Sequence, residues 1–364
     1  MENYIQKHLA KIQPYQPGKP VQEVQRELGL KDVLKLASNE NLFGPSPLAL
    51  NALRTHADEL NYYPDGGCYY LRKKIAEKFS VQMENVVLGN GTDEIIRILC
   101  HIFLDADSEI IMGSPSFVMY RISAMAMGAD VVEVPLRSHT LDLPAMLKKV
   151  GKRTRIVFIC NPNNPTGTIV KRKEVETFLR KLPDHVCAVF DEAYFEYIDD
   201  PEFADGMDCF KSDGGVVVLR TFSKIYGLAG LRVGYGFLPD DVVDAFNRVR
   251  NPFNVNQAAQ EAALAALDDD EHVRNSIEFN RRGKEILYSE LRRIGLDWIP
   301  TQANFVLVHV GGDSEEIFQK LLRMGVIVRP GKFLGYPEHI RVTIASADAC
   351  RRFTQTLEDI LKRN

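Results

Sequence analysis

A lysine lies among small and hydroxyl-bearing residues directly after an apolar run of the chain. The run is Val216–Leu219, the lysine is Lys224, and Thr221 and Ser223 come just before it. A glycine-rich segment that contains Arg232 follows. A lysine just beyond a buried strand is positioned to form a Schiff base with an aldehyde. Considered alone, the stretch fits a surface lysine after a strand equally well.

The neighbours of this lysine favour a phosphate group beside it. The hydroxyls of Thr221 and Ser223 and the guanidinium of Arg232 are donors that bind phosphate. A ligand that carries both an aldehyde and a phosphate is pyridoxal 5′-phosphate. The stretch therefore predicts a site for this cofactor next to Lys224.

A second candidate anion site lies at a glycine-rich turn. Gly89–Gly91 separates a predicted strand, Val86–Leu88, from a predicted apolar helix, Ile95–Phe103. Thr92 and Asp93 stand at the start of that helix, where free backbone N–H groups and the helix dipole favour an anion. The turn lacks the spacing of a P-loop or of a dinucleotide fingerprint. A plain capped helix start explains it about as well.

Three further residues follow predicted strands, at the edge where open α/β sheets bind ligands. Phe117 is either a core residue or a ring that stacks on a flat ligand. Asn164 lies in a loop made rigid by two prolines and a glycine, after the buried strand Arg155–Cys160. Asp191 is either a helix N-cap or a ligand-binding carboxylate, because a buried carboxylate is costly unless it is paired.

Two arginines and one tyrosine also have alternative interpretations. Arg329 and Arg341 lie on predicted strands among apolar neighbours. They either extend from a strand edge to water or bind an anion in a cleft. Tyr63 lies in a polar, turn-rich segment and is either an ordinary loop residue or a dimer contact, since exposed tyrosines are enriched at interfaces.

Strands and helices alternate along most of the chain. This alternation predicts an α/β fold with a mainly parallel sheet covered by helices on both faces. From Asn304 onward the pattern changes to that of a smaller α+β unit, and the proline-rich stretch Ile12–Pro20 predicts an extended arm. We expect an N-terminal arm over 1–45 that packs partly with the small domain, a large cofactor-binding domain over 46–256 and a small C-terminal domain over 257–364.

Composition excludes several classes of function. The 364 residues are 45% hydrophobic, which is enough for one large domain and a smaller one. The net charge is −4, and without a basic run nucleic acid is not an expected partner. The six cysteines are scattered without a C-x-x-C pair, as in reduced cytoplasmic proteins, so neither disulfides nor a metal site are expected. No targeting segment and no run of 18 apolar residues is present, so no membrane is expected as a partner.

The chain resembles the fold-type I pyridoxal-phosphate aminotransferases from Pro14 to the C-terminal helix. Within them it is most similar to the histidinol-phosphate aminotransferases. One departure is Phe117, where the family often has tyrosine, so stacking is kept and a phenol hydrogen bond is lost. The stretches that carry the resemblance are 14–20, Tyr63-Pro64, 161–167, Asp191-Glu-Ala-Tyr194, 221–224, 228–234, 251–256, 328–330 and 340–343.

The resemblance implies roles around the cofactor. Lys224 anchors it and moves the proton from Cα of the substrate, and Asp191 keeps the ring nitrogen protonated. Tyr194 and Asn164 donate hydrogen bonds to the ring oxygen, and Phe117 stacks on the ring. The residues implied in phosphate binding are Thr92, Asp93, Thr221, Ser223 and Arg232.

The resemblance also implies how substrate is bound. Arg341 binds the α-carboxylate, and Asn164 also contacts the substrate. Arg329, with Tyr15 of the arm, faces the substrate phosphate or the second carboxylate of glutamate. Tyr63 reaches the cofactor phosphate of the neighbouring subunit, which makes the protein a homodimer.

The implied reaction is the reversible conversion of imidazole-acetol phosphate and L-glutamate to L-histidinol phosphate and 2-oxoglutarate, in histidine biosynthesis in the cytoplasm. Two alternatives are an aromatic amino-acid aminotransferase of the same subfamily and a phosphothreonine decarboxylase-like enzyme on a similar scaffold. A cofactor-binding regulator without turnover is a third. The presence of both Lys224 and Asp191 argues against it.

Overall fold

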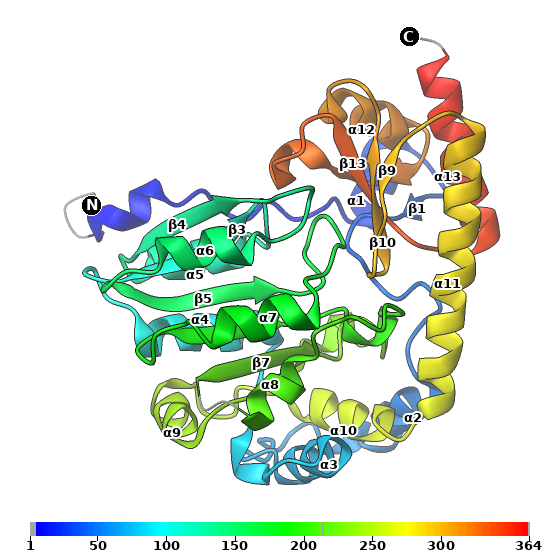
Figure 1. Ribbon diagram of the computed structural model, residues 1–364. Helices are drawn as coiled ribbons and strands as arrows, with labels where there is room; N and C mark the ends of the chain where they lie inside the picture. Colours follow the sequence, from blue (N-terminus) through cyan, green and yellow to red (C-terminus); the bar gives the residue numbers. More distant parts are fainter. Residues whose placement is uncertain (1–4, 213–214, 363–364) are drawn as a thin grey trace.

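A seven-stranded sheet forms the centre of the protein in the computed structural model, which describes residues 5–212 and 215–362 (Figure 1). The strand order is β2-β8-β7-β6-β5-β3-β4, and β8 alone runs antiparallel to its neighbours. The predicted mainly parallel α/β sheet is therefore confirmed. The strands are β2 (Val86–Gly89), β3 (Glu109–Ser114), β4 (Asp130–Pro135), β5 (Thr154–Cys160), β6 (Cys187–Asp191), β7 (Val216–Thr221) and β8 (Gly234–Phe237).

Helices cover both faces of this sheet because both faces of its central strands are apolar. In β5, Ile156 and Phe158 face one core while Val157 and Ile159 face the other, as the alternation of side chains along a strand requires. One face packs against α2 (Pro47–Thr55), α3 (Tyr69–Phe79), α6 (Leu143–Lys149), α7 (Arg172–Leu179), α8 (Gly206–Ser212) and α10 (Gln257–Ala266). The other packs against α4 (Thr92–Phe103), α5 (Met119–Ala126) and α9 (Asp240–Val249).

A smaller α+β unit has its own apolar core, built from the C-terminal part of the chain together with a few residues near the N-terminus. Its antiparallel sheet has the order β12-β13-β10-β9, and β1 pairs with β11 in a separate parallel ladder. The 24-residue helix α11 runs from beside α10 and α2 up to this unit, where it packs against α13 (Figure 1). The elements are α1 (Val21–Leu28), α11 (Asp270–Arg293), α12 (Ser314–Arg323), α13 (Ala347–Leu361), β1 (Leu34–Lys35), β9 (Trp298–Ile299), β10 (Phe305–His309), β11 (Val326–Ile327), β12 (Arg329–Pro330) and β13 (His339–Thr343).

Short 3₁₀ helices complete the described secondary structure. They are η2 (Lys7–Lys11), η3 (Ala57–Glu59), η4 (Met83–Asn85), η5 (Phe195–Tyr197), η6 (Ala229–Leu231) and η7 (Gly331–Leu334). Within the described ranges, no helix combines the length and the apolar character needed to cross a membrane.

Two details of packing bear on how the chain divides. Val24 and Leu36, before residue 46, lie in the core of the C-terminal unit. Helix α10 packs against α2 and α3, on the side of the large sheet. The division into 1–45, 46–256 and 257–364 stays a prediction, and the packing of α10 favours a large domain that includes this helix.

Candidate active site

A cavity of about 280 Å³ lies at the carboxyl ends of the parallel strands, facing β12 and β13. It brings together residues that are far apart in the sequence. Asp191 ends β6 and Thr221 ends β7, so neighbouring parallel strands deliver both to the same edge of the sheet. The predicted site residues that line the cavity are Tyr15, Thr92, Asp93, Phe117, Asn164, Asp191, Tyr194, Thr221, Ser223, Lys224, Arg232, Arg329 and Arg341.

Tyr63 is the predicted site residue that this chain does not bring to the cavity. Its side chain is 83% exposed, and its ring stacks on Phe253 with a centroid distance of 4.7 Å. Tyr62, Tyr69 and Tyr70 are exposed as well. Tyr63 therefore completes no site within its own chain.

One end of the cavity is built to hold an anion. Gly91 adopts a φ of +76°, and a Cβ there would lie 2.5 Å from Arg232 Nη2. A Cβ on Gly234 would lie 2.6 Å from the backbone nitrogen of Thr92, the first residue of α4. The two glycines thus let the start of α4 approach both Arg232 and β8. Arg232 Nη1 also lies 3.5 Å from Ser223 Oγ, so a helix N-terminus, a guanidinium and a hydroxyl converge.

Asp191 places a buried carboxylate at the floor of the cavity. The side chain is 3% exposed; Tyr120 Oη donates to its Oδ2 at 2.6 Å and the Ala193 N–H donates to its Oδ1 at 3.2 Å. Burial raises the pKa of Asp191 to about 6, although both hydrogen bonds oppose the rise. Because both of these donors are neutral, the site fits a cationic ligand group beside this carboxylate.

Lys224 lies three residues beyond β7 and is half-buried. Its Nζ donates to the Ser38 carbonyl oxygen at 3.3 Å and lies 5.6 Å from the centre of the Tyr194 ring. Burial lowers the pKa of Lys224 to about 8, and the positive charges of Arg341 and Arg232 lower it further. The lowered pKa gives Lys224 more neutral amine near neutral pH than an ordinary lysine has, and the neutral amine is the form that acts as a nucleophile or a general base.

The opposite wall carries the two arginines. Arg329 and Arg341 face each other across β12 and β13, and are 8% and 7% exposed. Arg341 donates to Asn164 Oδ1 at 2.6 Å and to the Ala37 carbonyl at 2.9 Å, and Arg329 Nη2 donates to the Gln16 carbonyl at 2.6 Å. All these acceptors are neutral. No carboxylate of the described residues is in hydrogen-bond contact with either buried guanidinium, an arrangement that suits a ligand with anionic groups.

Several residues around the cavity were not predicted from the sequence. Tyr120 holds Asp191, and its position one helical turn after Phe117 was the available signal. Asn39 stands among turn-forming residues in the sequence, yet it lines the cavity and contacts Tyr194. Its sequence neighbourhood gives no sign of that contact, because the partner is 155 residues away.

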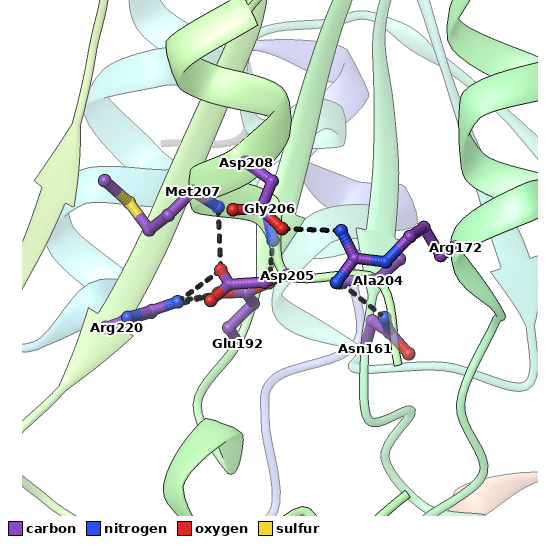
Figure 2. A network of polar contacts seen from close by, with 9 residues as sticks. All are labelled: Asn161, Arg172, Glu192, Ala204, Asp205, Gly206, Met207, Asp208 and Arg220. Atoms are coloured by element: carbon purple, nitrogen blue, oxygen red, sulfur yellow. Dashed lines mark hydrogen bonds and ion pairs between the residues drawn. The ribbon is translucent and has the colours of Figure 1, made fainter. Parts of the chain in front are cut away.

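A buried polar network lies behind the cavity (Figure 2). Arg220 donates to Glu192 Oε2 from Nε at 3.0 Å and from Nη2 at 2.8 Å, and Nη2 also donates to Asp205 Oδ1 at 2.7 Å. Glu192 Oε1 accepts the Gly206 N–H at 2.6 Å. Glu192 follows Asp191 and Arg220 precedes Thr221, so strand alternation turns this network away from the cavity. The network connects the ends of β6 and β7 on the side that faces away from the cavity.

Comparison with known proteins agrees with this geometry. Residues 31–357 match the family model described as aminotransferase class I and II. The chain belongs to this family. The aminotransferase is 48% identical over 97% of its length to the histidinol-phosphate aminotransferase of Moorella thermoacetica, of which it covers 92%. It is 47% identical over 98% of its length to histidinol-phosphate aminotransferase 2 of Carboxydothermus hydrogenoformans, of which it covers 99%.

Solved structures give the same picture of the aminotransferase fold. The histidinol-phosphate aminotransferase of Sinorhizobium meliloti in complex with pyridoxal-5′-phosphate superimposes with a TM-score of 0.89 and 25% identity, covering 98% of this chain and 97% of the other. The aspartate aminotransferase of Thermus thermophilus with maleate gives a TM-score of 0.85 at 24% identity, over 98% and 99% of the two chains. That second likeness supports the fold.

Proposed function

We propose that this aminotransferase uses pyridoxal 5′-phosphate to transfer the amino group of L-glutamate to imidazole-acetol phosphate, giving L-histidinol phosphate and 2-oxoglutarate, in histidine biosynthesis. One observation carries the proposal: a single cavity joins Lys224 and the buried Asp191 to two buried arginines. A phosphorylated substrate and glutamate both carry the anions that such arginines bind. The names of the relatives at 48% and 47% identity support the same substrate.

The residues of the cavity fit this cofactor. The start of α4 at Thr92, with Ser223 and Arg232, would hold its phosphate. The buried carboxylate of Asp191 would pair with its ring nitrogen, and Phe117 would lie against the ring. When bound, pyridoxal phosphate carries the amino group and withdraws electrons from the substrate Cα.

The chain's own groups would then direct the chemistry. Lys224 Nζ would take the proton from the substrate Cα, as a general base whose pKa burial has lowered to about 8. Asp191, held in place by Tyr120 and Ala193, would keep a negative charge beneath the ring nitrogen. Tyr194 would donate a hydrogen bond to the ring oxygen.

The two arginines would select the substrate. Arg341, oriented by its bonds to Asn164 and Ala37, would bind the α-carboxylate of glutamate. Arg329 would bind the substrate phosphate or the second carboxylate, with Tyr15 beside it: the centre of the Tyr15 ring is 5.8 Å from Arg329 Cζ. Small domain and arm would thus contribute the substrate contacts, and the large domain the cofactor contacts.

The protein would act as a homodimer in the cytoplasm. The exposed aromatic surface around Tyr63 and Phe253 supports a partner subunit there. Tyr63 would reach the cofactor phosphate of that partner. Five buried free thiols support a reducing compartment: Cys68, Cys100, Cys160, Cys187 and Cys350.

A donor panel tests the proposed substrate. Purified protein loaded with pyridoxal phosphate is mixed with 2-oxoglutarate and one of histidinol phosphate, phenylalanine, tyrosine or aspartate, and glutamate formation is measured. We expect kcat/KM for histidinol phosphate to exceed the others by at least about tenfold, roughly 1.4 kcal/mol. Preference for phenylalanine would favour the aromatic aminotransferase instead. In a parallel assay with phosphothreonine, release of carbon dioxide without glutamate formation would favour the decarboxylase.

A further inference from the structure

Asn39 is a buried polar residue inside the cavity that the proposed reaction does not use. Its side chain is 2% exposed, and its Nδ2 donates a hydrogen bond to Tyr194 Oη at 2.9 Å. Its Oδ1 is buried and has no hydrogen-bond partner among the described residues. The amide is therefore engaged by the protein through its donor end.

The backbone of Asn39 is held firmly by the C-terminal sheet. The Asn39 N–H donates to Thr343 Oγ1 at 3.0 Å, and Asn304 Nδ2 donates to the Asn39 carbonyl at 3.0 Å. The φ of Asn39 is +56°, in the left-handed region that asparagine tolerates better than most other residues. Side chain and backbone thus join strand β13 and the residue just before β10 to Tyr194 of the large domain.

The direction of the hydrogen bond decides what Tyr194 can do. A phenol has one proton to donate and can also accept. Because Asn39 donates to the Tyr194 oxygen, the phenol proton must point elsewhere. Tyr194 itself is 4% exposed and lines the cavity, so little competing water surrounds it.

We propose that Asn39 is a positioning residue: by donating to Tyr194 Oη, it directs the phenol proton toward the ring oxygen of the cofactor. The inference rests on the proposed pyridoxal-phosphate site and assigns no chemical step to Asn39. Burial raises the pKa of Tyr194, while Arg341 and the hydrogen bond from Asn39 oppose the rise. The phenol therefore keeps the proton that it is to donate.

Two substitutions of Asn39 separate hydrogen-bond direction from packing. Asn39→Asp has nearly the same shape, but its carboxylate accepts from Tyr194 and turns the phenol proton away from the cofactor. Asn39→Gly removes the side chain and keeps the positive φ without strain. Each is made in the unmodified protein and in a Tyr194→Phe background. Circular dichroism of the cofactor-free variants checks that they fold.

The first readout is the dissociation constant of pyridoxal phosphate, measured by equilibrium dialysis with cofactor-free protein. We expect Asn39→Asp to weaken binding about tenfold and Asn39→Gly about threefold, the scale of one hydrogen bond to a charged acceptor. In the Tyr194→Phe background both effects should shrink below about twofold, since residues that act through one another are not additive. Equal losses in both backgrounds, or unchanged binding by Asn39→Asp, would overturn the inference.

The second readout needs no cofactor. In protein labelled with ¹³C at tyrosine Cζ, the Tyr194 signal is identified by its absence from Tyr194→Phe. Near pH 8 its chemical shift should move in Asn39→Asp, because the phenol changes from accepting a hydrogen bond at residue 39 to donating one. An unmoved signal would place the amide contact elsewhere and overturn the inference. If unmodified protein and Tyr194→Phe both bind no pyridoxal phosphate, the proposed function fails, and this inference fails with it.

Discussion

Arg341 Nη1 donates a hydrogen bond of 2.6 Å to Asn164 Oδ1, across 177 residues of sequence. The bond occupies the acceptor end of the Asn164 amide, so its Nδ2 donor is left for a ligand. It also fixes one edge of the Arg341 guanidinium, whose Nη2 is held by the Ala37 carbonyl. This hydrogen bond thus connects Arg341, which is proposed to bind the substrate carboxylate, to Asn164, which is proposed to bind the cofactor ring oxygen.

Lysine substitutions should separate the roles of the two arginines. Arg341→Lys should lower kcat/KM about 10- to 100-fold for every carboxylate-bearing substrate, because lysine cannot reproduce a planar two-pronged contact. Arg329→Lys should lower kcat/KM for histidinol phosphate and glutamate by a similar factor and leave phenylalanine, where it is used, within about twofold. The measurement is kcat/KM for the three donors in each variant. Equal losses for phenylalanine and histidinol phosphate in Arg329→Lys would make Arg329 a structural residue.

Lys224 should be the point at which the cofactor is attached. Borohydride reduction of the loaded protein, followed by digestion and mass spectrometry, should find the pyridoxyl group on the peptide that contains Lys224. Lys224→Ala should show no such label and no measurable transamination, while its circular dichroism stays unchanged. A labelled peptide elsewhere, or turnover near the unmodified rate in the variant, would refute the assignment.

Asp191 should make cofactor binding depend on pH. Its pKa is raised to about 6 by burial in the cofactor-free protein, so it is charged above that pH and neutral below it. A cationic ring nitrogen favours the charged form, and affinity for pyridoxal phosphate should therefore fall as pH drops below about 6. Asp191→Asn is the control, because it keeps every other titrating group and should lose the fall in affinity that comes from protonation of Asp191. It should also lower kcat at least about 100-fold, the scale of a lost electrostatic contribution.

Identical pH profiles for the dissociation constant of Asp191→Asn and of the unmodified protein would contradict this role. So would a kcat reduced by less than about tenfold, roughly 1.4 kcal/mol.

Arg220→Met should destabilise the protein strongly. It leaves the fully buried Glu192 without its cation, which costs about 3–5 kcal/mol for a broken buried pair. The control is Arg172→Met, which breaks the pair with Asp208 at the protein surface and should cost less than about 1 kcal/mol (Figure 2). Urea unfolding of cofactor-free protein measures both. Adding Glu192→Leu to Arg220→Met should recover much of the lost stability. Equal stability losses for Arg220→Met and Arg172→Met would refute the distinction between a buried and a surface ion pair.

Tyr63 should act in the site of a partner subunit. Lys224→Ala and Tyr63→Phe protomers, mixed under conditions that exchange subunits, form mixed dimers in which one site carries both lesions and the other carries neither. After mixing, activity should rise above that of either variant alone. Each mixed dimer should approach about half the activity of an unmodified dimer, because one of its two sites is intact. Sedimentation should show a dimer before and after mixing. A monomer at working concentration, or no recovery on mixing, would contradict the shared site.

Local patterns along the chain are enough to predict the α/β sheet and most of the residues of the cavity. Residues such as Asp191 and Thr221 could be located because they stand directly after apolar strands, and parallel strands bring their carboxyl ends to one edge. Lys224 could be located for the same reason, since only two residues separate it from β7. These are local patterns, and local patterns can be read along the chain.

Which distant residues meet depends on the tertiary structure. The stretch 326–330 forms two short strands, because β11 pairs with β1 near the N-terminus while β12 pairs with β13. Helix α10 packs on α2, about 200 residues earlier in the chain. Asn39 has turn-forming neighbours in the sequence, and its contact with Tyr194 depends on Thr343 of β13 and on Asn304, just before β10, which hold its backbone. Such contacts depend on packing between elements, which the pattern of nearby residues does not encode.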